Sequence, residues 1–311
     1  MNFLSVYFLD SSTSSTKEKI PLFINPNVQN ILKSLTIKDV KKVYGTKKLK
    51  ELSIPKYKFM TDKQLKAVEE EAMEKMDDVL QMPPVMNERE EIDEIISNDP
   101  GIKGALNHRT IFTDISYGLD LYERTVVVRE PDGILREATW EERIRMHYTY
   151  LPDENRPVLS PSMLQPEHIH IPLDSGKYEY VLDRACYQFE PDDPDYIRVC
   201  HTVYAHVRQQ NKFDDLRMTR HFGPMIFHFV VSKTMDDVLV HFLNKEDTDA
   251  VFSSLKLYKI IHPESSFIMD DKSLLNSLKS YMENDSFKKS KLENAIQTYI
   301  ESQKKKLSEK I

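Results

Sequence analysis

Two closely spaced histidines are the residues of this 311-residue chain best suited to binding a metal. His168 and His170 alternate with isoleucines, so an extended strand would project both imidazoles from one face. No cysteine or carboxylate stands at ligand spacing beside the pair. The pattern therefore predicts a short strand over residues 168–171 and gives little support to a metal site.

Cysteines and catalytic motifs offer no stronger candidate for reaction chemistry. Cys186 and Cys200 are the only cysteines, and Cys200 falls on the apolar face of a predicted helix, which favours a packing role. Phosphate-binding glycine motifs, a nucleophile elbow, H-E-x-x-H and paired C-x-x-C are absent from the sequence. We expect no catalytic residue, cofactor, metal or small-molecule substrate. An unfamiliar active site would need a deep pocket, for which the surroundings of His168 and His170 are the candidate.

Positive charge is concentrated in two places where it could contact RNA. Residues 1–60 hold eleven lysines, no arginine and four acids, within a chain whose net charge is −7. The candidate contacts in this segment are Lys41, Lys42, Lys47, Lys48 and Lys50. Arg217 and Arg220 share a predicted helix face with His221 and could grip phosphates or a neighbouring carboxylate. A solvated surface explains either cluster equally well.

An acidic helix is predicted immediately after the lysine-rich segment. Thr61 and Gln64 form a capping box, and apolar residues recur at helical spacing from Leu65 onward. Pro83 and Pro84 follow and stop the helix. Residues 61–100 hold four bases and thirteen acids. The acidic face could dock a basic protein partner or could simply face solvent.

A hairpin is predicted at the centre of the chain. A strand over residues 124–129 contains three consecutive valines, a Glu-Pro-Asp-Gly turn follows, and a second strand covers 134–138. Thr139 and Glu142 then form a capping box that starts a helix, and we expect Trp140, the only tryptophan, to be buried beneath the hairpin. A linker over residues 98–107 leads to an expected strand over 112–117 beside the hairpin.

Helical patterns dominate the C-terminal half. Asp193 can cap a helix that begins at Pro194 and ends at Asn211. A short helix is predicted over 213–221, and the apolar run 225–231 must be interior. Further predicted helices cover residues 235–243, 247–261, 272–282 and 286–307.

These patterns predict an α+β fold that is predominantly α-helical, with a small hairpin-containing N-terminal lobe and a helical C-terminal lobe. Seven glycines disfavour a turn-dense β architecture. No apolar run approaches the roughly 20 residues of a transmembrane helix. The expected divisions are a disordered segment at 1–25, an α+β lobe at 26–151, a proline-rich connector with a short strand at 152–192, and a helical lobe at 193–311.

Several collinear stretches resemble one known family, the mitochondrial small-ribosomal-subunit protein twenty-two of animals. They are Tyr57-Lys58-Phe59-Met60-Thr61, Met82-Pro83-Pro84-Val85, Phe112-Thr113-Asp114-Ile115-Ser116-Tyr117, Val127-Val128-Arg129-Glu130-Pro131, Trp140-Glu141-Glu142-Arg143, Gln188-Phe189-Glu190-Pro191-Asp192, and Thr219-Arg220 with Phe222-Gly223. Together they cover roughly residues 55–245, whereas the segment from about Asp247 is divergent.

The resemblance implies a non-catalytic structural component of the mitochondrial small ribosomal subunit, with neighbouring ribosomal proteins and small-subunit rRNA as partners. It also implies location in the mitochondrial matrix. The residues before Lys17 include no base, so neither a secretory signal nor an arginine-rich presequence is visible there. The alternative from another class is a helical adaptor that binds one protein partner without RNA. Sedimentation with or without ribosomal subunits would separate the two.

Overall fold

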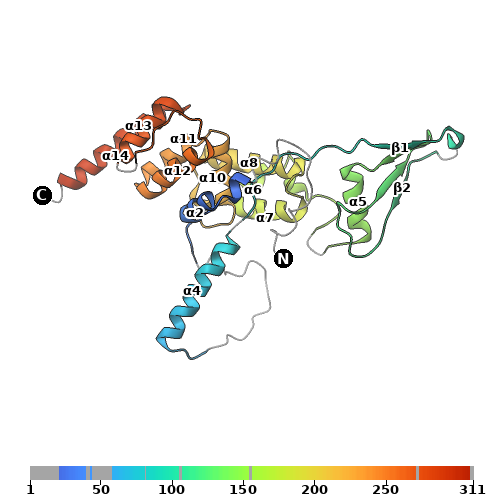
Figure 1. Cartoon of the computed structure of the whole chain (residues 1–311), viewed down its shortest axis with the longest axis horizontal. Helices are drawn as coiled ribbons and strands as arrows, with labels where there is room; N and C mark the ends of the chain where they lie inside the picture. Colours follow the sequence, from blue (N-terminus) through green and yellow to red (C-terminus); the bar gives the residue numbers. More distant parts are fainter. Residues whose placement is uncertain are drawn as a thin grey trace. The chain divides into compact units, whose positions relative to one another are not determined.

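The chain forms two compact units, shown with their helices and strands in Figure 1. The computed structural model describes residues 21–39, 43, 58–80, 82–104, 107–153, 156–270 and 273–308. The first unit combines Met1–Asn87 with Cys200–Ile311, and the second is Glu88–Val199. This division differs from the lobes expected at 26–151 and 193–311. The reason is that an N-terminal helix packs against helices that follow residue 221.

The second unit is built on a four-stranded antiparallel sheet with the strand order β1-β4-β3-β2. Its strands are β1 (Ile95–Asn98), β2 (Thr110–Thr113), β3 (Val126–Arg129) and β4 (Ile134–Glu137). The predicted central hairpin is confirmed as β3 and β4. In its turn the Gly133 N–H donates to the Glu130 carbonyl at 3.1 Å, and Gly133 has a φ of +93°, which favours glycine.

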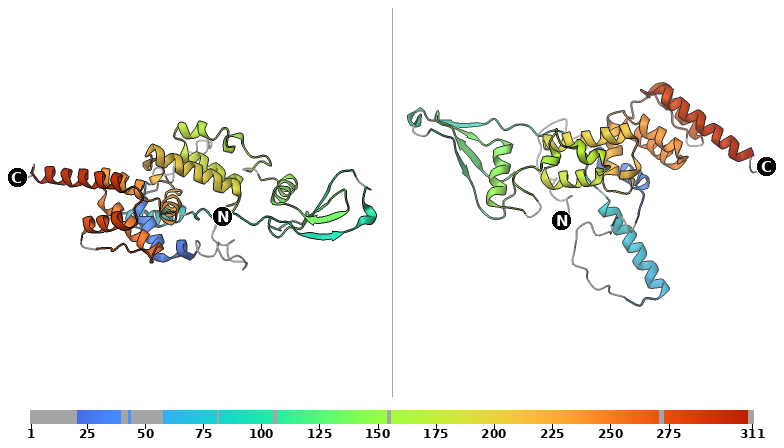
Figure 2. Two further views of the ribbon diagram at one scale, coloured as in Figure 1. Left: turned by 90° about the horizontal axis from the view of Figure 1, so that it is seen from above. Right: turned by 180° about the vertical axis from the view of Figure 1, so that it is seen from behind.

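Helix α5 (Trp140–Tyr150) packs beside the strands of this sheet, as the view from behind in Figure 2 shows. The predicted capping box between Thr139 and Glu142 is confirmed. Val126, Val128 and Ala138 form the small core, against which Ile111 and Met146 pack. Trp140 is only half-buried, so the expectation that it lies buried beneath the hairpin is wrong. The helix instead inserts Met146 toward the sheet.

Two flanking strands differ from the sequence-based expectation. β1 and the short 3-10 helix η1 (Pro100–Ile102) occupy part of the chain where a linker over 98–107 was expected. β2 pairs with β3 as predicted but ends at Thr113, earlier than the expected strand over 112–117. β1 is exposed along its whole length, so its residues lack the alternating pattern of a half-buried strand. Pairing with β4, rather than burial, defines it.

The proline-rich segment after α5 is more helical than predicted. It contains η2 (Ser162–Leu164), α6 (His170–Asp174) and α7 (Tyr178–Gln188). The expected strand over residues 168–171 is therefore wrong. Ile169 and Leu173, four residues apart, are both buried, whereas Ile171 is 57% exposed, which is a helical and not an alternating pattern.

The first unit is helical in the part that the structure describes. Its helices are α2 (Pro26–Leu35), α4 (Asp62–Val79), α9 (Asp214–Arg217), α10 (Phe222–Val231), α11 (Asp236–Asn244), α12 (Thr248–Ile261), α13 (Leu274–Asn284) and α14 (Lys289–Ser308). Helix α8 (Pro194–Gln210) has residues in both units. The C-terminal helices agree with the prediction, except that α9 is shorter than the expected 213–221. The predicted α+β, predominantly helical fold class is confirmed.

Helix α10 is part of the core of the first unit, since seven of its residues are buried. The N-terminal helix α2 packs against both α10 and α12. Phe23, which precedes α2, places its ring 5.1 Å from that of Phe227 in an edge-to-face contact. Phe23, which lies in the segment expected to be disordered, therefore contacts this core. Across the described residues, none of the helices combines the length and apolarity needed to span a membrane.

Candidate interaction surfaces

Arg217, predicted to contact RNA, is engaged inside the first unit. Its guanidinium pairs with the Asp247 carboxylate and lies 5.0 Å from the centroid of the Phe242 ring. Only 11% of its side chain is exposed. Burial acts to raise the pKa of Asp247, but the hydrogen bond from Arg217, the hydrogen bond from the Ala250 backbone N–H and the charge of Arg217 together outweigh burial, so the pKa is lowered. Arg217 thus joins α9 to the start of α12.

The other predicted RNA contacts are not assembled with Arg217 into a described site. Arg220 is half-buried and also makes interactions within the chain. The five lysines lie outside the described residues; they are Lys41, Lys42, Lys47, Lys48 and Lys50.

The structure gives no support to an active site around the histidines. His168 and His170 are both exposed, at the end of a turn and the start of α6. Within the described part of the chain, no three metal-ligating side chains are grouped so as to hold a metal ion. Cys200 is fully buried in α8, as its position on an apolar helix face predicts.

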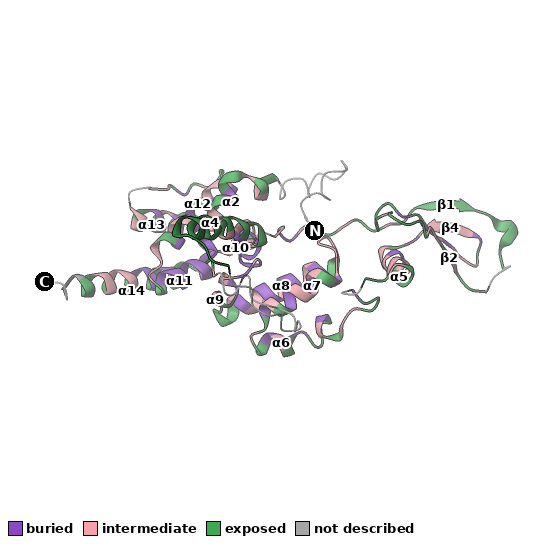
Figure 3. Cartoon of the chain, turned by 90° about the horizontal axis from the view of Figure 1, so that it is seen from below, coloured by how far each residue is buried: buried purple, intermediate pink, exposed green. Residues whose placement is uncertain are grey.

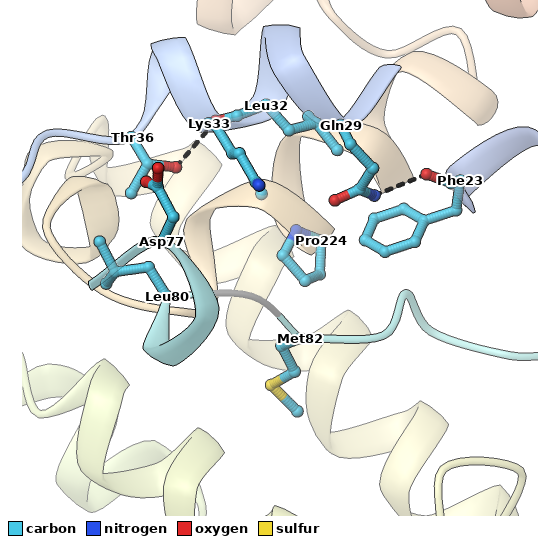
Figure 4. A pocket seen from close by; sticks show the side chains of 10 residues that line it. Phe23, Gln29, Leu32, Lys33, Thr36, Asp77, Leu80, Met82 and Pro224 are labelled. Atoms are coloured by element: carbon cyan, nitrogen blue, oxygen red, sulfur yellow. Dashed lines mark hydrogen bonds between the residues drawn. The ribbon is translucent and has the colours of Figure 1, made fainter. Parts of the chain in front are cut away.

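A hollow in the first unit lies among α2, the end of α4 and Pro224 of α10, as Figure 4 shows. Its volume is about 20 Å³. That is room for about one water molecule, whereas small-molecule sites span ~300 Å³ or more. The Thr36 hydroxyl at its edge already donates to the Leu32 carbonyl at 2.9 Å. The hollow is a packing feature rather than a substrate site.

An ordered loop on the second unit displays large apolar side chains. Tyr117 is 96% exposed and Ile115 is 65% exposed, in the loop between β2 and β3. Beneath the loop Arg124 is buried, and its guanidinium donates to three backbone carbonyls of the loop, those of Asp114, Ser116 and Leu119. A loop fixed in this way can bind a partner with little loss of conformational entropy.

The Arg124 guanidinium also fixes a histidine on α5. Its Nε donates to His147 Nδ1 at 3.2 Å. Burial and the charge of Arg124 both lower the pKa of His147, which keeps the imidazole neutral and its Nδ1 an acceptor. One buried arginine therefore ties the exposed loop to the helix that covers the sheet.

Trp140 belongs to a second polar cluster of the same unit. Its indole N–H donates to the Glu90 carbonyl at 2.8 Å, and the Arg89 guanidinium lies 4.8 Å from the ring centroid. Arg89 in turn donates to Asp193 at 2.7 Å, at the start of α8. The cluster therefore anchors the incoming chain at residues 89–90 to both α5 and α8.

Helix α4 leaves most of its large apolar side chains exposed. Its predicted capping box and its end before Pro83 are confirmed. Met76 is its one buried residue, although Leu65, Val68 and Val79 also lie on the apolar side of the helix. Figure 3 shows the helix exposed along most of its length.

Sequence reasoning identified the α4 pattern but missed the loop held by Arg124. An arginine next to a strand carries no signal of burial, because arginine is exposed in most proteins. The sequence predicts a strand over residues 112–117 instead of this loop. The contact that reveals the loop, from Arg124 to its backbone, depends on tertiary structure.

The described surfaces combine exposed apolar and charged faces, and they lack a pocket with reactive groups. This combination is typical of proteins that function as parts of larger assemblies. Comparison with known families agrees with this class. Residues 21–263 match the model of the family described as "Mitochondrial 28S ribosomal protein S22". The chain belongs to this family, and the resemblance drawn from the sequence is confirmed. It is a family of ribosomal structural proteins, not of enzymes.

Curated relatives extend the match to nearly the whole chain. The small ribosomal subunit protein mS22 of Bos taurus is 36% identical over 297 residues, which are 94% of this chain and 82% of the relative. The protein of the same name from Mus musculus is 34% identical over 296 residues, with the same coverage. Most of the segment beyond Asp247, which the sequence motifs left unassigned, is therefore included in the similarity to these relatives.

Proposed function

We propose that this chain is a structural component of the mitochondrial small ribosomal subunit, where it contributes to the architecture of the particle through its surfaces. The observation that carries the proposal is family membership over almost the full chain, with relatives named as small-subunit proteins. The exposed faces of α4 and of the loop after β2 fit such a role, because both present apolar area for protein neighbours.

The finer assignment of partners rests on charge. Protein neighbours suit the acidic surfaces, whereas the lysine-rich segment suits contact with rRNA phosphates. Its candidate residues are Lys41, Lys42, Lys47, Lys48 and Lys50. Arg217 and Arg220 remain predicted rRNA contacts in addition to their interactions within the chain.

Sucrose-gradient sedimentation of a tagged chain from mitochondria tests the proposal. We expect the chain to sediment with the small subunit and to remain there after washing with moderate salt. A chain that stays near the top of the gradient would instead support an adaptor without RNA and would contradict a ribosomal role.

Charge reversal tests the lysine assignment separately. Replacing Lys41, Lys42, Lys47 and Lys48 by glutamate should reduce incorporation into the subunit, because repulsion of phosphates replaces attraction. The matched control reverses four exposed lysines elsewhere, Lys63, Lys103, Lys212 and Lys279. Equal incorporation of both variants would assign the lysine-rich segment to solvent and leave the ribosomal role intact.

A further inference from the structure

Helix α4 carries a row of apolar side chains that the described part of its own unit covers at only one residue. Leu65 and Val68 are 48% and 45% exposed, and we call these two residues the α4 stripe. At 3.6 residues per turn they lie on the same side as Met76, which is fully buried. The exposed stripe is therefore continuous with a face that already packs against protein.

The docked part of the helix is confined to its C-terminal end. Besides Met76, Asp77 forms a 2.7 Å ion pair with Lys38, and residues 61–71 are all exposed. An exposed helix with few tertiary contacts is only marginally stable in water. Burial of the stripe against a partner would supply the stabilisation that the first turns lack.

The charge of α4 indicates what that partner is. Seven acids and three lysines lie within residues 62–79. The exposed acids of the helix are Asp62, Glu69, Glu70, Glu71, Glu74 and Asp78. Of the lysines, Lys75 is already paired with Glu71. RNA phosphates would be repelled by this surface, and so would the equally acidic helix of a second copy.

We propose that the α4 stripe is the docking surface for a basic amphipathic helix of a neighbouring protein. Leu65 and Val68, three positions apart, form one narrow line before the covered Met76, which suits the apolar side of a single helix. Lysine or arginine residues beside the apolar side of that partner would face the acids of α4. This inference rests on the proposed function, because it names one protein contact of the chain within the subunit.

A peptide-binding assay with the full chain tests the chemistry. The probe is a fluorescein-labelled 20-residue helical peptide with leucines on one face and lysines on both sides of it. We expect saturable binding, and about tenfold weaker binding to Leu65→Asp and to Val68→Asp, because each places a charge in the apolar contact. Ala67→Asp is the matched control, since it adds the same charge to an exposed residue of the opposite face.

Three results of this assay would overturn the proposal. One is binding of a glutamate version of the peptide as tight as that of the lysine version. Another is an equal effect of Ala67→Asp and Val68→Asp. A third is displacement of the lysine peptide by a single-stranded RNA that binds the same variants. The circular dichroism spectrum and the melting temperature should be unchanged in all three variants, because the three replaced side chains are exposed.

Photo-crosslinking in purified small subunits tests the surface in its assembly. A benzoylphenylalanine at position 68 should give a protein adduct that survives ribonuclease, and one at position 67 should give none. An adduct to RNA, to a second copy or to the lysine-rich segment of the same chain would overturn the proposal. If the chain does not sediment with the subunit, the proposed function fails instead, so the two failures are distinguishable.

Discussion

The hydroxyl of Tyr281 in α13 donates a 2.9 Å hydrogen bond to the carboxylate of Asp236 in α11, and both side chains are buried. The same carboxylate accepts the backbone N–H groups of Phe287 and Lys288, at 2.9 and 2.8 Å, immediately before α14. The Asp236 carboxylate therefore accepts hydrogen bonds from a side chain of α13 and from the turn that joins α13 to α14. Burial and the negative charge of Asp236 both raise the pKa of Tyr281, so the phenol is protonated and a hydrogen-bond donor at neutral pH.

Tyr281→Phe should lower the free energy of unfolding by about 1–3 kcal/mol, because it removes a donor to a buried charged acceptor. Tyr299→Phe in α14 is the control and should change it by less than about 0.5 kcal/mol, since Tyr299 is only half-buried. Urea unfolding followed by circular dichroism measures both. Equal effects of the two substitutions would contradict the assigned role of Asp236.

Stability should fall in acid through the neighbouring residue Asp237. Burial raises the pKa of its carboxyl, but Lys288 and Lys291, at 2.6 and 2.8 Å, outweigh that effect and hold the pKa below its ordinary value of 3.8. A carboxyl with a lowered folded-state pKa stabilises the fold while it is charged. That contribution is present above about pH 4 and is lost as the pH falls toward the folded-state value.

Asp237→Asn provides the comparison for this pH dependence. The variant should be less stable than the unmodified chain at pH 7. The gap between them should shrink toward pH 3, because the carboxyl of the unfolded chain takes up a proton there before the carboxyl of the folded chain does. Urea unfolding at pH 7, 5, 4 and 3 measures the gap. Two parallel stability profiles would show that the lysines contribute nothing through Asp237.

Arg124→Met should release the loop that displays Tyr117. The substitution leaves the carbonyls of Ser116 and Leu119 without the donors that now lie 3.1 and 2.9 Å away. We expect the free energy of unfolding to fall by about 2 kcal/mol or more, and hydrogen exchange over residues 114–121 to become faster. Arg109→Met is the control, because the Arg109 side chain is 60% exposed and makes a surface ion pair with Glu142. Unchanged exchange in Arg124→Met would mean that the loop is held by other contacts.

Trp140→Ala should lower the free energy of unfolding by about 2 kcal/mol. This is less than the ~3–5 kcal/mol expected for a fully buried ring, because the indole is half-buried. Trp140→Phe keeps the stacked ring but loses the bond to the Glu90 carbonyl, and should cost about 1 kcal/mol. Since Trp140 is the only tryptophan, its fluorescence reports the same environment. Acrylamide should quench it measurably, and complete protection would contradict the half-buried position.

Local sequence signals predicted the elements that carry either a regular spacing of apolar residues or a capping motif. The valines of β3, the capping boxes at Thr61 and Thr139, and the apolar side of α8 each specify an element without help from the rest of the chain. The histidine pair failed as a strand signal because four residues are too few to set a period. Leu173, one turn beyond Ile169, restores the helical pattern.

The interaction surfaces could be predicted only in part, because exposure is a tertiary property. Apolar residues at helical spacing normally pack against the same chain, and at Met76 they do. Nothing in the sequence distinguishes Met76 from Val68, which shares its side of the helix but is left uncovered. Likewise the role of Arg217 depends on Asp247, a residue 30 positions away whose proximity no local pattern reveals.

The discontinuity of the first unit determines the order in which the polypeptide can mature. Residues 88–199 are contiguous and can collapse as soon as they emerge, but α2 finds its packing partners α10 and α12 only after more than half of the chain has followed. Contacts between such distant segments slow folding and prolong the exposure of unpaired apolar surface. During vectorial synthesis or translocation, α2 therefore stays unpacked until α10 and α12 have emerged, and its apolar side is open to chaperone binding in that time.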